Sequence, residues 1–194
     1  MISLIWRHIR IMIEKINRLV LVIGGSGSGK SEFAEHMALR LHDCNRGHLY
    51  YVATMVSHDK ESDERIYRHV RRRDSTAFET IERPTGIDSI AVQDKDVILL
   101  ECMSNLLANE MFKGDIIDNE CVTRILDDVY KLHNQCDMVI VSNEVSLDGC
   151  EYDDITKQYI ADISYINRKI ADVADTVVEV VAGIPVYIKG SGEN

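Results

Sequence analysis

The sequence predicts one α/β domain in which helices cover both faces of a mostly parallel β-sheet. Apolar runs of strand length alternate along the chain with longer segments of helical periodicity, and uniformly apolar strands are typical of a parallel sheet buried on both faces. The chain has 194 residues, which leaves room for one such domain and little more. We assign the domain to residues 19–194. Residues 1–18 are treated as an N-terminal extension, either a short amphipathic helix or a segment that precedes a true start at Met12.

The first half of the domain is expected to contain four strands and two helices. A strand at Leu19–Ile23 is followed by a helix from Ser31 to about His42, in which apolar side chains recur with helical spacing. The other elements are, in chain order, a strand at Leu49–Ala53, a very polar helix at Asp63–Arg73, a short strand at Phe78–Glu82 and a strand at Val97–Leu100.

The second half is expected to end in an antiparallel hairpin at the edge of the sheet. Before the hairpin we expect helices at Ser104–Phe112 and Asn119–Asn134 and a strand at Met138–Val141. A long amphipathic helix follows, marked by apolar residues at helical spacing, namely Ile155, Tyr159, Ile163, Ile166 and Ile170. The hairpin strands are Thr176–Val181 and Val186–Lys189, with Gly183, Ile184 and Pro185 as the turn.

Composition and charge exclude several classes of protein. A net charge of −10 argues against a general nucleic-acid binder. No apolar run reaches the roughly 18 residues of a membrane span, and residues 1–18 lack the unbroken apolar core of a secretory signal. The five cysteines are widely spaced without a C-x-x-C pair, which predicts reduced, mostly buried thiols and a cytoplasmic protein.

One run of basic residues interrupts this acidic chain. The five arginines Arg65, Arg68, Arg71, Arg72 and Arg73 fall within nine residues. Guanidinium groups gathered in this way suit a compact anionic ligand better than a long polyanion. The alternative is a solvated helix face whose charges are paired with nearby acidic residues.

A glycine-rich segment after the first strand matches the phosphate-loop pattern G-x-x-x-x-G-K-[ST]. It reads Gly24, Gly25, Ser26, Gly27, Ser28, Gly29, Lys30 and Ser31. Glycines let backbone N–H groups converge on phosphate oxygens, and the start of the following helix adds its positive end. We expect Lys30 to bridge the β- and γ-phosphates and Ser31 to bind Mg²⁺. A Gly/Ser-rich turn is the alternative, but a strand precedes this loop and a helix follows it.

A phosphate loop of this kind also needs a carboxylate at the end of a neighbouring strand, which holds Mg²⁺ directly or through water. Glu101 follows the apolar strand Val97–Leu100 and fits that role. An ordinary acidic residue at a strand end is the alternative interpretation.

Several further motifs, in their order along the chain, resemble those of a known enzyme family. They include Arg65-Ile66-Tyr67-Arg68-His69, Leu99-Leu100-Glu101-Cys102, Asn143-Glu144-Val145 and Val181-Ala182-Gly183-Ile184-Pro185. The chain resembles the bifunctional adenosylcobinamide kinase / adenosylcobinamide-phosphate guanylyltransferase family of cobalamin biosynthesis. The resemblance extends from about Leu19 to Lys189.

The resemblance implies two reactions. A nucleoside triphosphate, ATP or GTP, phosphorylates the aminopropanol hydroxyl of the corrinoid adenosylcobinamide. A histidine then attacks the α-phosphate of GTP, and GMP passes from it to adenosylcobinamide phosphate. His69 stands at the position of that histidine, and the residues matching the family's nucleotide contacts are the loop Gly24–Ser31, Ala53, Thr54, Met55, Arg73, Glu82 and Glu101. The family also implies a homo-oligomer, a small ring like a trimer.

The residues around His69 agree with a nucleophilic role. Imidazole attacks phosphorus only when it is neutral, and neighbouring arginines such as Arg68 and Arg72 disfavour the imidazolium ion. The same guanidinium groups offset the negative charge that develops on the α-phosphate. An exposed histidine on a polar helix is the alternative interpretation.

Some positions depart from the family pattern and leave other functions open. Gly27 stands where many relatives carry arginine, the segment Ser146–Tyr152 replaces a glycine-rich stretch, and the long helix has Ile160, Ala161 and Ser164 at positions where we expect Arg, Asp and Gly. These departures concern the acceptor substrate more than the GTP end. The alternatives are a P-loop small-molecule kinase without guanylyl transfer and a nucleotide-binding homologue without catalysis.

Overall fold

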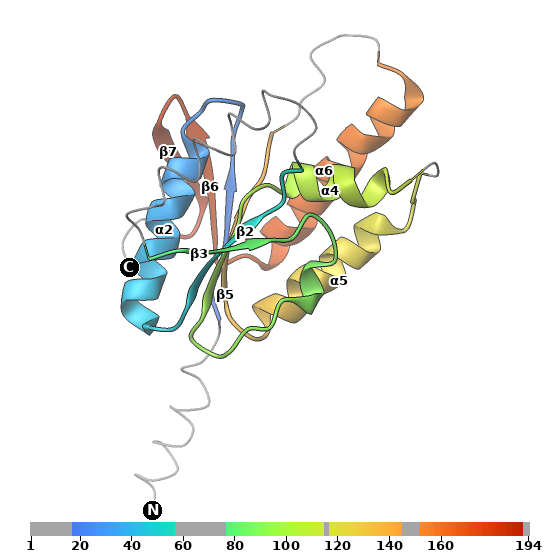
Figure 1. The fold of residues 1–194 in the computed structure, drawn as a ribbon. Helices are drawn as coiled ribbons and strands as arrows, with labels where there is room; N and C mark the ends of the chain where they lie inside the picture. Colours follow the sequence, from blue (N-terminus) through green and yellow to red (C-terminus); the bar gives the residue numbers. More distant parts are fainter. Residues whose placement is uncertain (1–16, 57–76, 115–116, 145–151, 192–194) are drawn as a thin grey trace, which may run out of the picture.

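The computed structural model describes residues 17–56, 77–114, 117–144 and 152–191, which fold around one seven-stranded sheet (Figure 1). The strands lie in the order β3-β2-β4-β5-β1-β6-β7, and all neighbours are parallel except β6 and β7, which are antiparallel. Their bounds are β1 Leu19–Ile23, β2 Leu49–Ala53, β3 Glu79–Glu82, β4 Val97–Leu100, β5 Asp137–Val141, β6 Thr176–Val181 and β7 Ile184–Lys189. The predicted mostly parallel α/β sheet with a C-terminal hairpin is confirmed.

Helices cover both faces of this sheet. The helix α2 (Lys30–Asn45) lies on one face, while α4 (Met103–Met111), α5 (Cys121–His133) and α6 (Asp154–Val173) lie on the other (Figure 1). Ala34, Ala38 and Leu41 of α2 pack against one side of the strands in one apolar core. A second and larger core lies under α4, α5 and α6. Because side chains of a strand point alternately to the two faces, every central strand contributes to both cores.

Most predicted elements occur close to their expected bounds, and β1, β2 and β4 have the expected bounds. The structure adds a short 3₁₀ helix, η1 (Ile87–Ser89), that the sequence analysis did not expect. The predicted polar helix at residues 63–73 lies outside the described residues.

The long helix α6 differs from its predicted pattern at its first turn. Asp153 caps the helix, since its side chain accepts a hydrogen bond from the backbone N–H of Thr156 at 2.7 Å. Ile163, Ile166 and Ile170 are fully buried, as expected. Ile155, however, is 46% exposed, and Ile160 is buried in the following turns. Ile155 therefore does not make the buried contact that the spacing predicted for it.

The hairpin turn lies earlier than predicted. Ala182 and Gly183 form it with positive φ angles of 50° and 81°, while Ile184 and Pro185 belong to β7. Two consecutive positive φ angles are typical of the tight hairpin turn whose twist matches that of the strands. Pro185 is tolerated because β7 is the edge strand of the sheet. Within the described residues, no helix combines the length and apolar character that crossing a membrane requires.

Candidate functional site

The predicted phosphate loop connects β1 to α2 at the carboxyl edge of the sheet, the edge at which the parallel strands end. Gly24 has a φ of 156°, and a Cβ atom there would lie 2.6 Å from the backbone oxygen of Val180. Only glycine therefore fits the close approach of the loop to β6. The helix α2 begins directly after Gly29. Its first backbone N–H groups are thus available to an anion.

Two neighbouring segments fix the shape of this loop. The backbone N–H of Gly183, in the turn between β6 and β7, donates to the oxygen of Ser28 at 2.8 Å. On the other side, the backbone N–H of Glu144, just after β5, donates to the oxygen of Gly24 at 3.2 Å. The loop is therefore held between the exits of the two strands that flank β1.

Lys30 is the buried cation of the site. Its side chain is only 9% exposed, and its Nζ donates to the backbone oxygen of Gly25 at 3.0 Å. Burial lowers the pKa of Lys30 below its ordinary value, and the nearby Cys102 at the end of β4 acts weakly in the opposite direction. An ammonium has three N–H donors, so a partly desolvated one that bonds to this carbonyl has donors left for an anion.

Glu101 lies at the end of β4, but its carboxylate is already engaged by backbone groups. Its Oε2 accepts hydrogen bonds from the N–H groups of Thr54 at 3.1 Å and Met55 at 3.4 Å. The hydroxyl of Thr54 donates to the backbone oxygen of Cys102 at 3.0 Å. Hydrogen bonds therefore connect Thr54 and Met55, which follow β2, to Glu101, which follows β4.

The remaining described residue of the predicted nucleotide set lies beside them. Glu82 ends β3 and stands opposite Ala53 of β2 in the parallel register. The N–H of Arg83 extends this pairing by donating to the oxygen of Ala53 at 2.8 Å. His69 and Arg73, together with the other arginines of the basic run, lie outside the described residues. The described part of the chain contains no group of three His, Cys, Asp or Glu residues placed to hold a metal ion.

A polar network behind the loop was not predicted. Asn143, after β5, donates from Nδ2 to Oγ of Ser104 at 3.1 Å, and Asn167 of α6 donates to the backbone oxygen of Asn143 at 3.1 Å. Tyr159 donates from its hydroxyl to the oxygen of Ser104 at 3.0 Å. The sequence signal was an asparagine two residues after an apolar strand, Asn143, but the sequence pattern did not identify the residues that it contacts. This network ties α4 and α6 to the exit of β5.

Three buried oxygens near this edge have no hydrogen-bond partner among the residues that the structure describes: Oγ of Ser28, Oγ of Ser142 and Oδ1 of Asn167. Buried polar atoms are almost always paired in folded proteins. Oγ of Ser28 belongs to the glycine loop itself, so this loop can accept a further polar partner.

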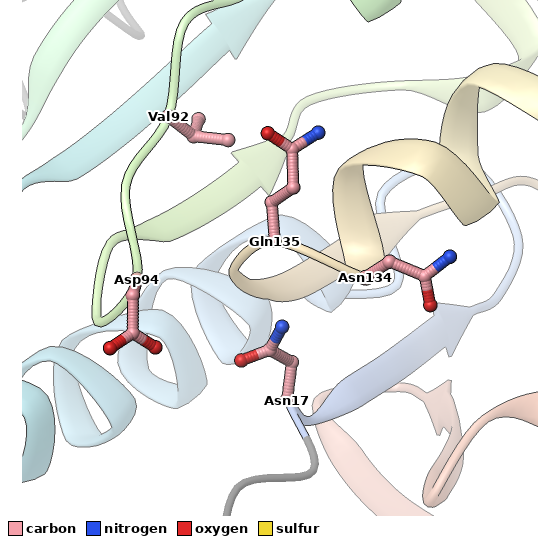
Figure 2. A pocket seen from close by; sticks show the side chains of 5 residues that line it. All are labelled: Asn17, Val92, Asp94, Asn134 and Gln135. Atoms are coloured by element: carbon pink, nitrogen blue, oxygen red, sulfur yellow. The ribbon is translucent and has the colours of Figure 1, made fainter.

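A pocket of about 350 Å³ lies at the opposite, amino edge of the sheet (Figure 2). Its lining residues all precede strands, namely Asn17 before β1, Val92 and Asp94 before β4, and Asn134 and Gln135 before β5. Amide side chains predominate there, and neither Lys30 nor Glu101 contributes to it. This pocket is therefore separate from the predicted phosphate site.

Comparison with known proteins agrees with the motifs at the carboxyl edge. The family described as cobinamide kinase / cobinamide phosphate guanyltransferase matches residues 20–188. The chain belongs to this family. The matched range contains the phosphate loop, the three strand exits around Glu101 and the position of His69.

Two curated relatives are matched over nearly their whole length. A bifunctional adenosylcobalamin biosynthesis protein of Salmonella typhimurium is 32% identical over 187 residues, covering 88% of this chain and 99% of the relative. A bifunctional adenosylcobalamin biosynthesis protein of Pseudomonas aeruginosa is 27% identical over 175 residues, covering 88% and 96%. Among solved structures, an ATPase domain has a TM-score of 0.51 at 12% identity, covering 91% of this chain and 81% of that one. This last likeness shows the P-loop NTPase-like fold alone.

Proposed function

We propose that this chain phosphorylates the aminopropanol hydroxyl of adenosylcobinamide with ATP or GTP and then transfers GMP from GTP to adenosylcobinamide phosphate, two steps of cobalamin biosynthesis. The single observation that supports this most is the glycine loop with its buried Lys30, found in a chain of the cobinamide kinase / cobinamide phosphate guanyltransferase family. Membership of this family indicates the two reactions. The glycine loop and the start of α2 provide backbone N–H groups of the kind that bind phosphate.

The glycine loop binds the triphosphate in this proposal. Residues Gly24–Ser31 direct backbone N–H groups and the start of α2 toward the β- and γ-phosphates. Lys30 would leave the oxygen of Gly25 and bind these phosphates, which regains for its ammonium part of the solvation that burial removed. In the kinase step, the acceptor hydroxyl attacks the γ-phosphorus and loses its proton to solvent. The bond from that phosphorus to the bridging oxygen breaks, and the nucleoside diphosphate leaves.

Magnesium would neutralise phosphate charge in both reactions. The ion prefers oxygen ligands in an octahedral arrangement and usually retains several waters. The hydroxyl of Ser31, in the first turn of α2, and the carboxylate of Glu101 are oxygen donors of the required kind. Oε2 of Glu101 accepts two backbone N–H groups, and the carboxylate would hold the ion directly or through water.

His69 is the nucleophile of the second reaction. A neutral ring nitrogen attacks the α-phosphorus of GTP, a P–N bond forms, and the bond to the β-phosphate oxygen breaks to release pyrophosphate. An oxygen of adenosylcobinamide phosphate then attacks the same phosphorus, the P–N bond breaks, and the imidazole is regenerated. Ala53, Thr54, Met55, Arg73 and Glu82 are proposed to bind the nucleotide during both steps.

We also propose that the enzyme works as a cytoplasmic homo-oligomer. The four described cysteines are free, which fits a reducing compartment. The hairpin exposes apolar residues that another subunit could cover, namely Val181, Ile184, Val186 and Ile188. Light scattering coupled to gel filtration would test the assembly, and a monomer at micromolar concentration would contradict it.

A labelled adduct on His69 tests the function directly. Incubation with α-labelled GTP and Mg²⁺ should give an acid-labile protein adduct, and intact-mass spectrometry should show the added GMP. His69→Ala should abolish the adduct, while His36→Ala, on the exposed side of α2, should retain it. Equal labelling of both variants would refute the nucleophile. Phosphorylation of adenosylcobinamide without any adduct would favour the kinase that lacks guanylyl transfer.

A further inference from the structure

Asn109 of α4 joins the ends of two strands that are distant from it in sequence. Its Nδ2 donates to the backbone oxygen of Thr54 at 2.8 Å and to that of Pro84 at 3.1 Å. A side-chain amide carries two N–H hydrogens, so these two bonds use both of them. Because both partners are carbonyl oxygens, only the nitrogen of the amide can face them, which fixes the orientation of the side chain.

The exit of β2 is held from the β4–α4 segment. Thr54 is fully buried, and Glu101 accepts from its N–H, Cys102 accepts from its hydroxyl, and Asn109 donates to its oxygen. Every polar group of Thr54 is therefore bonded to residues 101–109. The backbone at the end of β2 is therefore fixed by the β4–α4 segment.

The exit of β3 is held from the same helix. Asn109 donates to the oxygen of Pro84, and the next residue, Glu110, accepts from the N–H of Gly86 at 2.7 Å. Glu110 is itself only 2% exposed and pairs with Arg124 at 3.1 Å. Two successive residues of α4 thus fix the backbone directly after Glu82.

We propose that Asn109 is a positioning residue for guanylyl transfer. The inference rests on the proposed function, in which Ala53, Thr54 and Met55 after β2 and Glu82 at the end of β3 bind the guanine nucleotide. These contacts lie on two strand exits, and the amide of Asn109 is bonded to the backbone of both. Asn109 acts in this proposal through its two backbone bonds, which set the spacing between the two groups of contacts.

The bonds of the Asn109 amide do not reach the glycine loop. It is held by the backbone N–H groups of Gly183 and Glu144, which belong to other segments than those that the Asn109 amide holds. Loss of the Asn109 amide should therefore disturb the nucleoside end of the site and spare the phosphate end. Inorganic tripolyphosphate, which has the phosphates of GTP without its nucleoside, separates these two effects.

The test compares two variants of Asn109 with a matched control in the full-length protein. Asn109→Leu removes both donors at similar volume, and Asn109→Asp keeps the shape but turns the donors into acceptors. Asn17→Ala removes the same kind of bond, from Nδ2 of Asn17 to the oxygen of His133 at 2.9 Å, at the opposite edge of the sheet. Affinities for GTP and for tripolyphosphate with Mg²⁺ are measured by calorimetry, and the rate of GMP adduct formation by intact-mass spectrometry.

Both Asn109 variants should bind GTP more weakly and form the adduct about tenfold or more slowly, since small displacements of reacting groups cost large factors in rate. Their affinity for tripolyphosphate should stay within about twofold of the Asn17→Ala value, because the glycine loop is held by other segments. In hydrogen exchange, the amides of Thr54, Arg83 and Gly86 should exchange faster in Asn109→Leu than in Asn17→Ala.

Several results would overturn the proposal. Unchanged GTP affinity, or an equal loss of GTP and tripolyphosphate affinity, would show that Asn109 does not act on the nucleoside end. Unchanged exchange at the three amides would show that it does not hold the strand exits. If the wild-type protein forms no GMP adduct, the guanylyltransferase proposal fails, and the ratio of the two affinities still decides whether Asn109 organises the nucleotide contacts.

Discussion

The two edges of the sheet differ in what their buried polar groups bind. At the amino edge, three aspartates near the starts of strands accept hydrogen bonds from backbone N–H groups. These N–H groups belong to residues at or directly before the start of another strand. Asp137 accepts from Arg18 at 2.7 Å, Asp175 from Leu19 at 2.8 Å and Asp96 from His48 at 2.8 Å. Each of these carboxylates therefore supplies an acceptor to a backbone N–H that would otherwise lack one at the start of the sheet.

The carboxyl edge keeps polar groups available. Lys30 is buried and bonds to the oxygen of Gly25, and the buried hydroxyl oxygens of Ser28 and Ser142 have no partner within the described part of the chain. A single oxygen of Glu101 accepts the N–H groups of both Thr54 and Met55. The same parallel sheet therefore has carboxylates that accept from backbone N–H groups at one edge and a partly desolvated lysine beside a glycine loop at the other.

Replacing Lys30 should have the largest effect. Lys30→Ala removes the cation that we propose to bind the β- and γ-phosphates, and we expect kcat/KM of both reactions to fall by about 100-fold or more, the range for a lost charge-stabilising group. The free energy of unfolding should stay equal or rise, because a partly desolvated ammonium is removed. Steady-state kinetics and urea unfolding measure the two quantities. A large loss of stability would show instead that Lys30 has a structural role, like the aspartates of the amino edge.

Alanine substitutions at one glycine of each edge test whether the two edges have different roles. A Cβ at Gly24 would meet the backbone oxygen of Val180, and a Cβ at Gly47, at the amino edge, would meet the backbone oxygen of Lys95. Both alanine variants should lower the melting temperature, since backbone must shift. Only Gly24→Ala should also weaken tripolyphosphate binding, by about tenfold, equivalent to about 1.4 kcal/mol. If Gly47→Ala weakens binding equally, the two edges are not independent.

Substitution of Asp96, at the amino edge, should lower stability and leave activity unchanged. Its Oδ1 accepts from the N–H of His48 and its Oδ2 from the N–H of Gln93 at 2.7 Å, and the residue is 2% exposed. Asp96→Asn replaces one acceptor by a donor, and an unsatisfied buried group costs about 1–3 kcal/mol of stability. Turnover per folded molecule should remain unchanged. A fall in kcat at full folding would contradict the assignment of this edge to stability alone.

The difference between the edges also explains what the sequence could predict. The strands β1, β2 and β4 were predictable because each is an unbroken apolar run. The glycine loop was predictable because its residues are contiguous. The junction at Thr54 was not, because its partners lie 47 to 55 positions away and depend on how α4 packs.

The hairpin turn was misplaced for a local reason. Proline favours turns, and Pro185 therefore suggested one, whereas the edge position of β7 allows proline inside a strand. The roles of His69 and Arg73 stay predictions, since both lie outside the described residues. Sequence patterns thus identified the groups expected to touch phosphate more readily than the groups that hold them in place.

The reactivity of two thiols, one at each edge of the sheet, is expected to show the smallest effect. Cys102 lies at the carboxyl edge near Lys30, and Cys136 lies before β5 at the amino edge. Burial raises the pKa of Cys102, and it raises the pKa of Cys136 to about 12. Because the folded pKa of Cys136 exceeds its unfolded value of 9.0, its stabilising effect is complete below pH 9 and is lost as the pH rises toward 12.

At pH 8, iodoacetamide should therefore modify the exposed Cys44 first, Cys102 more slowly and Cys136 only after unfolding. GTP with Mg²⁺ should slow modification of Cys102 by a few-fold, because the phosphates would lie beside Lys30, and should leave the Cys44 rate unchanged. Peptide mass spectrometry over time measures each thiol. If GTP does not change the modification rate of Cys102, the phosphates do not lie near the end of β4. Rapid modification of Cys136 in the folded protein would show that its thiol is not shielded as the structure describes.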